Sequence, residues 1–182
     1  STLNNFRFSK IKIDQLYDIV VQICYALDAL HNQNILHKDL KLENILFSQD
    51  NNAITVKLID YGFSKIDLES DPQQVSGTLP YMAPELYQGK HADNTSDFYS
   101  LGVILYKITT GSFPYNLNQI NALLTGNQQY FIPVFPSELN PDIPANLEKF
   151  ILRLLEKNPI NRFQNCKEII AYINRIQNKK YS

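Results

Sequence analysis

Residues 37–44 read HKDLKLEN and bring a carboxylate, an ammonium group and an amide within six positions. The carboxylate of Asp39 can orient a hydroxyl group and accept its proton, and the ammonium group of Lys41 can neutralise charge on a moving phosphate. The amide oxygen of Asn44 is a hard ligand that suits Mg²⁺. This combination of side chains is typical of a site for phosphoryl transfer.

The neighbouring segments place this stretch on a loop. Before it, apolar residues recur at three- and four-residue steps from 14 to 32, which predicts a long helix. After it, apolar residues 45–47, turn-forming residues 48–52 and β-branched residues at 54–59 predict a small hairpin. Asp60 follows the second strand directly and adds another hard oxygen ligand, so possible Mg²⁺ ligands stand at both ends of one hairpin.

The rest of the chain is predicted to be mainly helical. The apolar run 101–108 ends at Gly111 and predicts a central helix, because it is apolar on nearly every side. Another helix is predicted over 147–155, and Asn165 with Glu168 resembles a capping box that opens a last helix. Residues 60–84 show no sustained period and suggest a functional loop. The expected fold class is therefore mainly α with a small β hairpin.

The composition limits the functions that are possible. The chain has 182 residues, of which 44% are apolar and 19% are charged, which fits one globular domain. A net charge of -1 argues against a general binder of nucleic acid or of membrane surfaces. We find no apolar run of about 18 residues and no signal peptide at the start, so we expect an intracellular protein without membrane insertion, cytoplasmic or, as the open alternative, nuclear.

The two cysteines, Cys24 and Cys166, lie in different segments that both look helical. They have neither a metal-ligand spacing nor a CxxC spacing. We therefore expect two reduced, buried thiols that fill the core, with a functional thiol as the less favoured alternative.

In these residues the chain resembles the eukaryotic protein kinases. Their catalytic loop, metal-binding triplet and Ala-Pro-Glu triplet match residues 37–44, 60–62 (DYG) and 83–85 (APE) in order. Further matches at suitable separations are GTLPY at 77–81, Asp97, Gly102, Pro114 and Arg162. The resemblance covers residues 1–182 and implies a protein-kinase-like large (C-terminal) lobe, with the catalytic loop at 37–44 and the activation segment at 60–85.

The resemblance implies a role for each matching residue. Asp39 resembles the catalytic base, Lys41 the contact to the γ-phosphate, and Thr78 the residue that contacts the base in the serine/threonine type. Asn44 and Asp60 resemble the Mg²⁺ ligands. The implied activity is transfer of the ATP γ-phosphate to a protein Ser/Thr hydroxyl, with ATP and Mg²⁺ as cofactors.

Other matching residues are implied on the nucleotide side and in the scaffold. Leu46 resembles the floor under the adenine, above Ile104 and Ile108 of the central helix. Glu43 lies beside the nucleotide ligands and also resembles an acid that some kinases use to select basic substrates. The scaffold is expected to contain a buried ion pair between Glu85 and Arg162, an Asp97 that accepts backbone N–H groups of the catalytic loop, and a structural His37.

The chain also departs from the family's pattern. The resemblance implies a preceding small lobe with a glycine-rich loop, and we find no such loop among six glycines. We therefore expect weak ATP binding and no activity from the chain alone, and a non-catalytic lobe that binds proteins is the alternative function. Lys38 replaces an arginine that usually grips a phosphate on the activation segment. The sequences LEN at 42–44 and GTLPY at 77–81 resemble those of the calcium/calmodulin-dependent group of kinases. The oligomeric state of the protein stays open.

Overall fold

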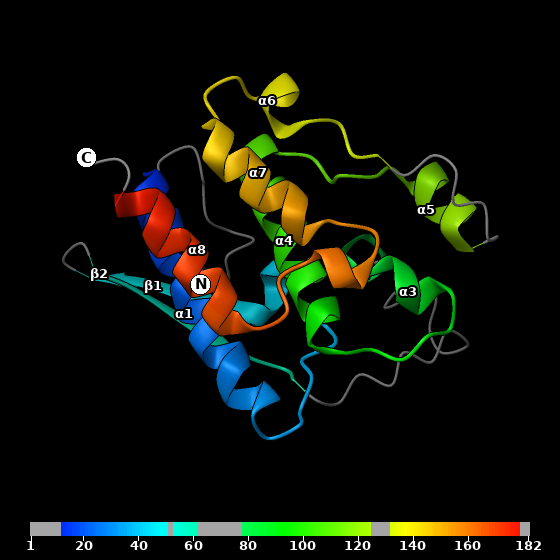
Figure 1. Cartoon of the computed structure of the whole chain (residues 1–182), viewed down its shortest axis with the longest axis horizontal. Helices are drawn as coiled ribbons and strands as arrows, with labels where there is room; N and C mark the ends of the chain where they lie inside the picture. The colour runs from blue at the N-terminus through cyan, green and yellow to red at the C-terminus, as the bar shows by residue number, and fades with distance from the viewer. Residues whose placement is uncertain (1–11, 51–52, 62–77, 125–131, 179–182) are drawn as a thin grey trace.

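A computed structural model describes residues 12–50, 53–61, 78–124 and 132–178, and Figure 1 shows them arranged around the helix α4, Asn94–Thr110. Twelve consecutive residues of α4, from Thr95 to Tyr106, are buried. The helix begins well before the apolar run, because the Asp93 carboxylate accepts a hydrogen bond from the Thr95 N–H at 2.8 Å and caps its first turn. It ends at Gly111, whose φ of +76° is the left-handed conformation expected of a helix stop.

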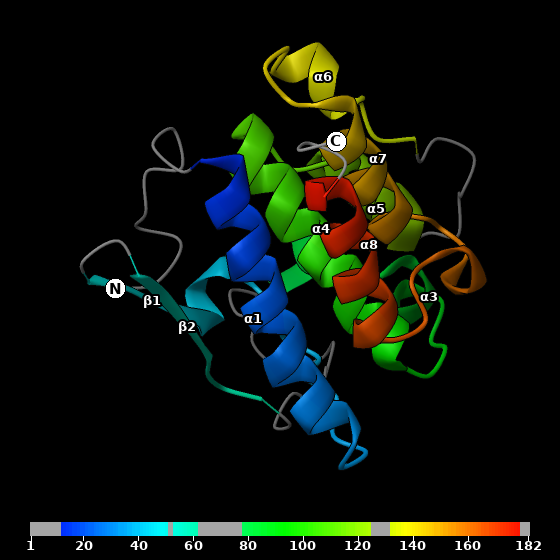
Figure 2. The same cartoon turned by 60° about the vertical axis from the view of Figure 1, so that its left-hand side comes forward.

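Two long helices lie side by side next to α4 in both views (Figures 1 and 2): α1, Ile13–His31, and α8, Cys166–Asn178. The predicted helix at 14–32 is thereby confirmed. Asn165 accepts a hydrogen bond from the Glu168 N–H at 2.9 Å, as the predicted capping box requires. The other half of that box differs, because the Glu168 carboxylate accepts from the Gln164 N–H instead.

The hairpin consists of β1, Ile45–Asp50, and β2, Ala53–Leu58, paired antiparallel with Ile45 opposite Leu58 and Asp50 opposite Ala53. The predicted turn at 48–52 is too long, because residues 48–50 continue the ladder and only 51–52 separate the strands. The side chain of Gln22 in α1 donates to the Ile54 carbonyl at 2.9 Å and accepts from the Val56 N–H at 3.0 Å. These bonds attach the outer edge of β2 to α1.

Shorter elements complete the described part of the chain. Gly102 allows the helix α7, Ala145–Leu154, to approach α4 closely, since a Cβ there would lie 2.7 Å from the Leu154 Cβ. The remaining elements are η3 Leu42–Asn44, η4 Leu79–Tyr81, α3 Pro84–Tyr87, α5 Leu117–Leu124, α6 Pro136–Leu139, α7 Ala145–Leu154 and η5 Pro159–Asn161.

These elements confirm the predicted fold class, mainly α with a small β hairpin, in the arrangement of a protein-kinase-like large lobe. Cys24 and Cys166 are buried and not joined by a disulfide, as expected. Among the described residues, we find no helix that combines the length and the apolar character needed to cross a membrane.

Candidate active site

Asp97, which lies in the first turn of α4, holds the loop before β1 through hydrogen bonds with its backbone. Its two carboxylate oxygens accept hydrogen bonds from the backbone N–H groups of His37 at 3.0 Å and Lys38 at 2.9 Å. The expectation that Asp97 holds this loop is therefore confirmed. The position at the N-terminus of α4 also favours the negative charge of Asp97, because unpaired N–H groups lie at that end of a helix.

Lys38 has a φ of +64°, a conformation that residues with a long side chain rarely adopt. Such a backbone costs about 1–3 kcal/mol and persists only where the surroundings enforce it. The hydrogen bond from its N–H to the buried Asp97 carboxylate is such a constraint. The strained residue directly precedes Asp39, so this constraint determines where the Asp39 carboxylate lies.

Four of the predicted site residues lie close together, next to the backbone that Asp97 holds. The Thr78 hydroxyl donates to Asp39 Oδ1 at 3.0 Å, and Lys41 Nζ lies 2.8 Å from Asp39 Oδ2 and 3.2 Å from Thr78 Oγ1. Asn44 Nδ2 donates to the Asp39 carbonyl at 2.8 Å and to Asp39 Oδ2 at 3.0 Å. The fold thus brings Thr78, which is distant in sequence, into the hydrogen-bond network of the loop at 37–44.

This cluster remains open to solvent. The side chains of Asp39 and Lys41 are 18% and 20% exposed, whereas Asn44 is buried. A hydroxyl substrate can therefore approach the carboxylate, while the ammonium group stays close enough to neutralise developing negative charge. The geometry fits a general base that is oriented by Thr78 and paired with a cation.

The two predicted metal ligands lie at the same end of the hairpin. The Ile59 N–H donates to the Asn44 carbonyl at 3.0 Å, which extends the ladder and places the exposed Asp60 beside Asn44. Both described side-chain hydrogen bonds of Asn44 use its amide nitrogen, so its amide oxygen remains as a possible ligand. Asp60 has a φ of +58°, a turn that aspartate tolerates.

This donor set fits Mg²⁺. An amide oxygen and a carboxylate suit a cation that commonly keeps several waters and binds phosphates directly. Within the residues that the structure describes, no group of three or more His, Cys, Asp or Glu side chains could hold a metal ion. A site completed by a nucleotide's phosphates does not require such a group.

Two further predicted residues flank this end of the hairpin. Leu46 lies on β1 between the buried Ile45 and Phe47, and its side chain is 36% exposed on the opposite face. Glu43 lies exposed in η3. Ile104 is buried in α4 and Ile108 is partly buried. The exposed face of Leu46 leaves an apolar surface on which a flat aromatic ring could rest.

The expected ion pair between Glu85 and Arg162 is confirmed. Two parallel contacts of 2.8 Å join the guanidinium group to the carboxylate, and both side chains are buried. Glu85 also accepts from the Ser96 hydroxyl, and Arg162 donates to the carbonyls of Thr95, Glu156 and Lys157. The pair joins the segment after Thr78 to the body of the lobe.

The sequence reasoning missed His31 as a partner in the site. Its Nε2 lies 2.8 Å from Asp97 Oδ2, and both side chains are buried. Burial lowers the pKa of His31, but hydrogen bonds with Asp97 and Cys166 outweigh burial and raise the pKa to about 9. The available signal was a histidine in the last turn of the helix that leads into the loop.

His37 has the structural role that was expected. It is fully buried, and neither ring nitrogen has a hydrogen-bond partner among the described residues. Burial lowers the pKa of His37, so the ring is neutral at pH 7. Gly62, Gly77 and the residues of the predicted activation segment between them lie outside the described residues.

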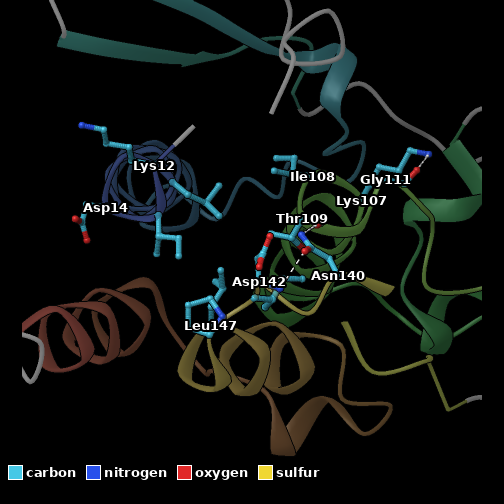
Figure 3. Close-up of a pocket in the computed structure, with 13 residues that line it drawn as sticks. Lys12, Asp14, Lys107, Ile108, Thr109, Gly111, Asn140, Asp142 and Leu147 are labelled. Carbon is cyan, nitrogen blue, oxygen red and sulfur yellow. Dashed lines mark hydrogen bonds between the residues drawn. The ribbon is translucent and has the colours of Figure 1, made fainter. Parts of the chain in front are cut away.

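The structure also contains a cavity that lies away from the cluster around Asp39. It has a volume of about 920 Å³ and opens between the N-terminus of α1, the C-terminus of α4 and the loop before α7 (Figure 3). Part of its polar rim forms hydrogen bonds within the protein, since Asn140 donates to the Thr109 carbonyl and Lys107 to the Gly111 carbonyl. The chemistry-bearing residues are the better guide to the active site, because they converge at the other ends of α1 and α4.

Comparison with known proteins agrees with this geometry. Residues 2–176 match the protein kinase domain. The chain is 37% identical over 173 residues to a probable serine/threonine-protein kinase of Clostridium acetobutylicum, covering 93% of this chain and 26% of that protein. It is 39% identical to the serine/threonine-protein kinase Pkn1 of Myxococcus xanthus, covering 87% and 23% of the two chains.

A further relative is the serine/threonine-protein kinase PknB of Mycobacterium leprae, 34% identical over 166 residues that cover 89% of this chain and 26% of PknB. The chain spans about a quarter of the length of these curated relatives.

Proposed function

Because the chain belongs to the protein kinase domain family, we propose that it supplies the catalytic lobe of a serine/threonine protein kinase. The proposed reaction transfers the γ-phosphate of ATP to a serine or threonine hydroxyl of a protein substrate. The observation that carries the proposal is the closed network of Asp39, Lys41, Thr78 and Asn44. Loss of any of the charged members would favour a non-catalytic lobe, and all are present.

In this proposal Asp39 is the base. Its carboxylate orients the substrate hydroxyl and accepts its proton, and Thr78 fixes the rotamer by donating to Oδ1. Lys41 neutralises charge on the transferred phosphate from its position 2.8 Å from Asp39 Oδ2. The lysine and threonine at these positions favour a serine/threonine kinase over a tyrosine kinase, in agreement with the names of the relatives.

In this proposal, the nucleotide and its metal ion bind at the hairpin and the residues next to it. Asn44 and Asp60 would hold Mg²⁺, which neutralises phosphate charge when bound. Leu46 would support the adenine ring and Glu43 would lie near the nucleotide or a basic substrate residue. We assign residues 37–44 to the catalytic loop and residues 60–85 to the activation segment, and we place the protein in the cytoplasm. The calcium/calmodulin-dependent subgroup stays a prediction.

The test is phosphate transfer by the protein supplied together with a small lobe of the kind that the resemblance implies. With radiolabelled Mg-ATP and a mixed Ser/Thr peptide library, Asp39→Asn should lower the rate roughly 100- to 10,000-fold, the usual contribution of general acid–base catalysis. Binding of Mg-ATP should remain within about twofold, because Asp39 is not a nucleotide contact in this assignment.

Asp142→Asn is a matched control, since Asp142 is exposed and only its backbone N–H makes a described hydrogen bond. It should leave the rate unchanged. Retained turnover in Asp39→Asn would overturn Asp39 as the base. A wild-type protein that binds partners but transfers no phosphate would instead support the alternative function, a protein-binding lobe.

A further inference from the structure

A second cavity, of about 730 Å³, opens beside the segment that follows Thr78. Pro80 of η4 lines one side, and the loop after α4 and the first half of α5 line the other. Two residues of chain span at most about 7 Å, so this cavity begins close to Thr78, which donates to the Asp39 carboxylate. A peptide with its hydroxyl at Asp39 can therefore place a neighbouring residue in the cavity.

The wall of this cavity is fixed by contacts with α4. The Tyr81 ring meets the Phe113 ring edge-on, with the ring centroids 5.3 Å apart. The Ser100 hydroxyl donates to the Tyr81 carbonyl at 2.9 Å. The segment that contains Pro80 is thus held between α4 and the loop after it, and the cavity is already formed without a bound peptide.

Lys107, near the end of α4, places a positive charge at this cavity. Its ammonium group lies 4.6 Å from the centre of the Phe113 ring and donates to the Gly111 carbonyl at 2.9 Å. Figure 3 shows the side chain turned toward that carbonyl and away from Lys12 and Leu147. Among the described residues, no carboxylate forms an ion pair with Lys107. An ammonium group has three donors, so donors remain for a ligand.

The rest of the lining suits an anion that lies next to an apolar surface. Of the described residues around the cavity, Lys107 alone carries a charge. The Asn116 amide oxygen accepts from the Gln119 N–H, which leaves the Asn116 NH₂ group as a possible donor. The apolar part of the lining consists of Pro80, Phe113, Tyr115 and Ile120. A carboxylate on a short aliphatic side chain matches these groups in charge and in polarity.

We propose that this cavity receives a residue flanking the acceptor of the protein substrate, and that Lys107 selects aspartate or glutamate there. The inference rests on the proposed function, because it names the substrate class of the same site. Glu43 does not line the cavity, so a basic preference that it sets would concern another position of the peptide. Lys107 is partly exposed, and a single ion pair at such a position gives a preference of about two- to fivefold.

The first experiment measures phosphate transfer by the protein supplied with a small lobe. Serine peptides carry aspartate, asparagine or lysine at one position at a time, within about four residues, or about 14 Å of extended chain, of the acceptor. At one position, aspartate should raise kcat/KM about two- to fivefold over asparagine, and lysine should lower it. The preference should shrink in about 0.5 M NaCl, because salt screens an exposed pair.

Charge variants test whether Lys107 sets this preference. Lys107→Glu should reverse the ratio of aspartate to lysine peptides, and Lys107→Arg should retain it. Lys149→Glu is the matched control, because it makes the same change in net charge at an exposed position outside the cavity. It should keep the wild-type ratio. Melting temperatures within about 2 °C of wild type would show that each variant is folded.

A binding measurement separates this inference from the proposed function. Fluorescent peptides with alanine in place of the acceptor serine are titrated with the protein, and anisotropy should show tighter binding of the aspartate peptide, lost in Lys107→Glu. That result without transfer to any peptide would overturn the proposed function and support the cavity's preference. Transfer or binding with no acidic preference at any position would overturn the inference, as would a preference that Lys107→Glu leaves unchanged.

Discussion

Two acid–base pairs in this molecule have the same contact distance and opposite surroundings. Glu85 and Arg162 approach to 2.8 Å with side chains 7% and 0% exposed, and Asp39 and Lys41 approach to 2.8 Å with 18% and 20% exposed. In the first pair the guanidinium donors are also taken up by backbone carbonyls. In the second pair one side of the carboxylate remains open to solvent. Contact distance alone therefore does not separate a structural pair from a reactive one.

The first prediction removes Arg162, the cation of the buried pair. Arg162→Met leaves the buried Glu85 carboxylate without its charge partner, and breaking a buried pair in this way costs about 3–5 kcal/mol. Urea unfolding of the variant should show this loss of unfolding free energy. It should be the largest stability effect among the changes considered.

Arg153→Met is the matched control, because Arg153 pairs with Glu168 at 37% and 36% exposure. An exposed pair contributes about 0–1 kcal/mol, and the lost contact of the Arg153 guanidinium with the Phe163 ring adds a similar amount. Equal losses for the two methionine variants would contradict the contrast between buried and exposed pairs.

The next change tests the anchor beneath the loop. Asp97→Asn keeps one acceptor oxygen but presents an NH₂ group to the second backbone N–H. Leaving a buried N–H unpaired costs about 1–3 kcal/mol, and the buried His31 imidazolium also loses its carboxylate partner, so we expect a loss of about 3 kcal/mol in urea unfolding. Turnover of the whole protein should also fall, because Lys38 then loses the support for its strained backbone.

The control for this change is Asp93→Asn, which removes a negative charge at the same helix end. Asparagine caps a helix about as well as aspartate, so the change in stability should stay within about 0.5 kcal/mol. If both variants lose the same stability, the effect comes from helix-end charge and not from the bonds to the loop.

These anchors show what the sequence could predict. Asp97, Glu85 and Arg162 were identified by their place in an ordered set of motifs, and the geometry confirms their expected partners. The long helices were predictable because burial of one face imposes a period on the apolar residues. Gly111 was predictable as a helix end because glycine adopts positive φ without strain.

Other features depend on contacts that no local pattern records. The pairing of His31 with Asp97 joins residues that only the packing of α1 against α4 brings together. The hairpin turn was predicted too long because polar residues 48–50 favour turns locally. Pairing with residues 53–55 extends the strand through them. Tertiary hydrogen bonds outweighed local propensity there.

A third prediction concerns the buried imidazole of His37, which lies two residues before Asp39, and the pH dependence of stability that it causes. Burial lowers the pKa of His37 below its unfolded value of about 6.5, although Asp97 and Asp39 oppose this effect. The unfolded state therefore binds a proton first as the solution becomes acidic. Stability from this group is present above pH 6.5 and is lost as the pH falls through its folded value.

Between pH 7.5 and 5.5, His37→Phe should reduce the loss of unfolding free energy, by at most about 1.4 kcal/mol per pH unit, the limit for one proton. Urea unfolding at several pH values measures the slope. His91→Phe, at an exposed position, should keep the wild-type slope. Identical slopes for wild type and His37→Phe would mean that His37 protonates without cost in the folded protein.

The smallest expected change in stability belongs to the residue with the largest expected role in chemistry. Asp39→Asn weakens a partly exposed pair and leaves the backbone carbonyl of residue 39 bonded to Asn44, so the unfolding free energy should change by less than about 1 kcal/mol. A loss as large as that of Arg162→Met would make the Asp39 cluster another structural anchor, and lost activity could then result from misfolding. A small change in stability together with lost turnover would separate the two pairs by function, as their exposure to solvent does.

Thr78→Ala should likewise change stability by less than about 1 kcal/mol, because it removes one hydrogen bond to the same Asp39 carboxylate.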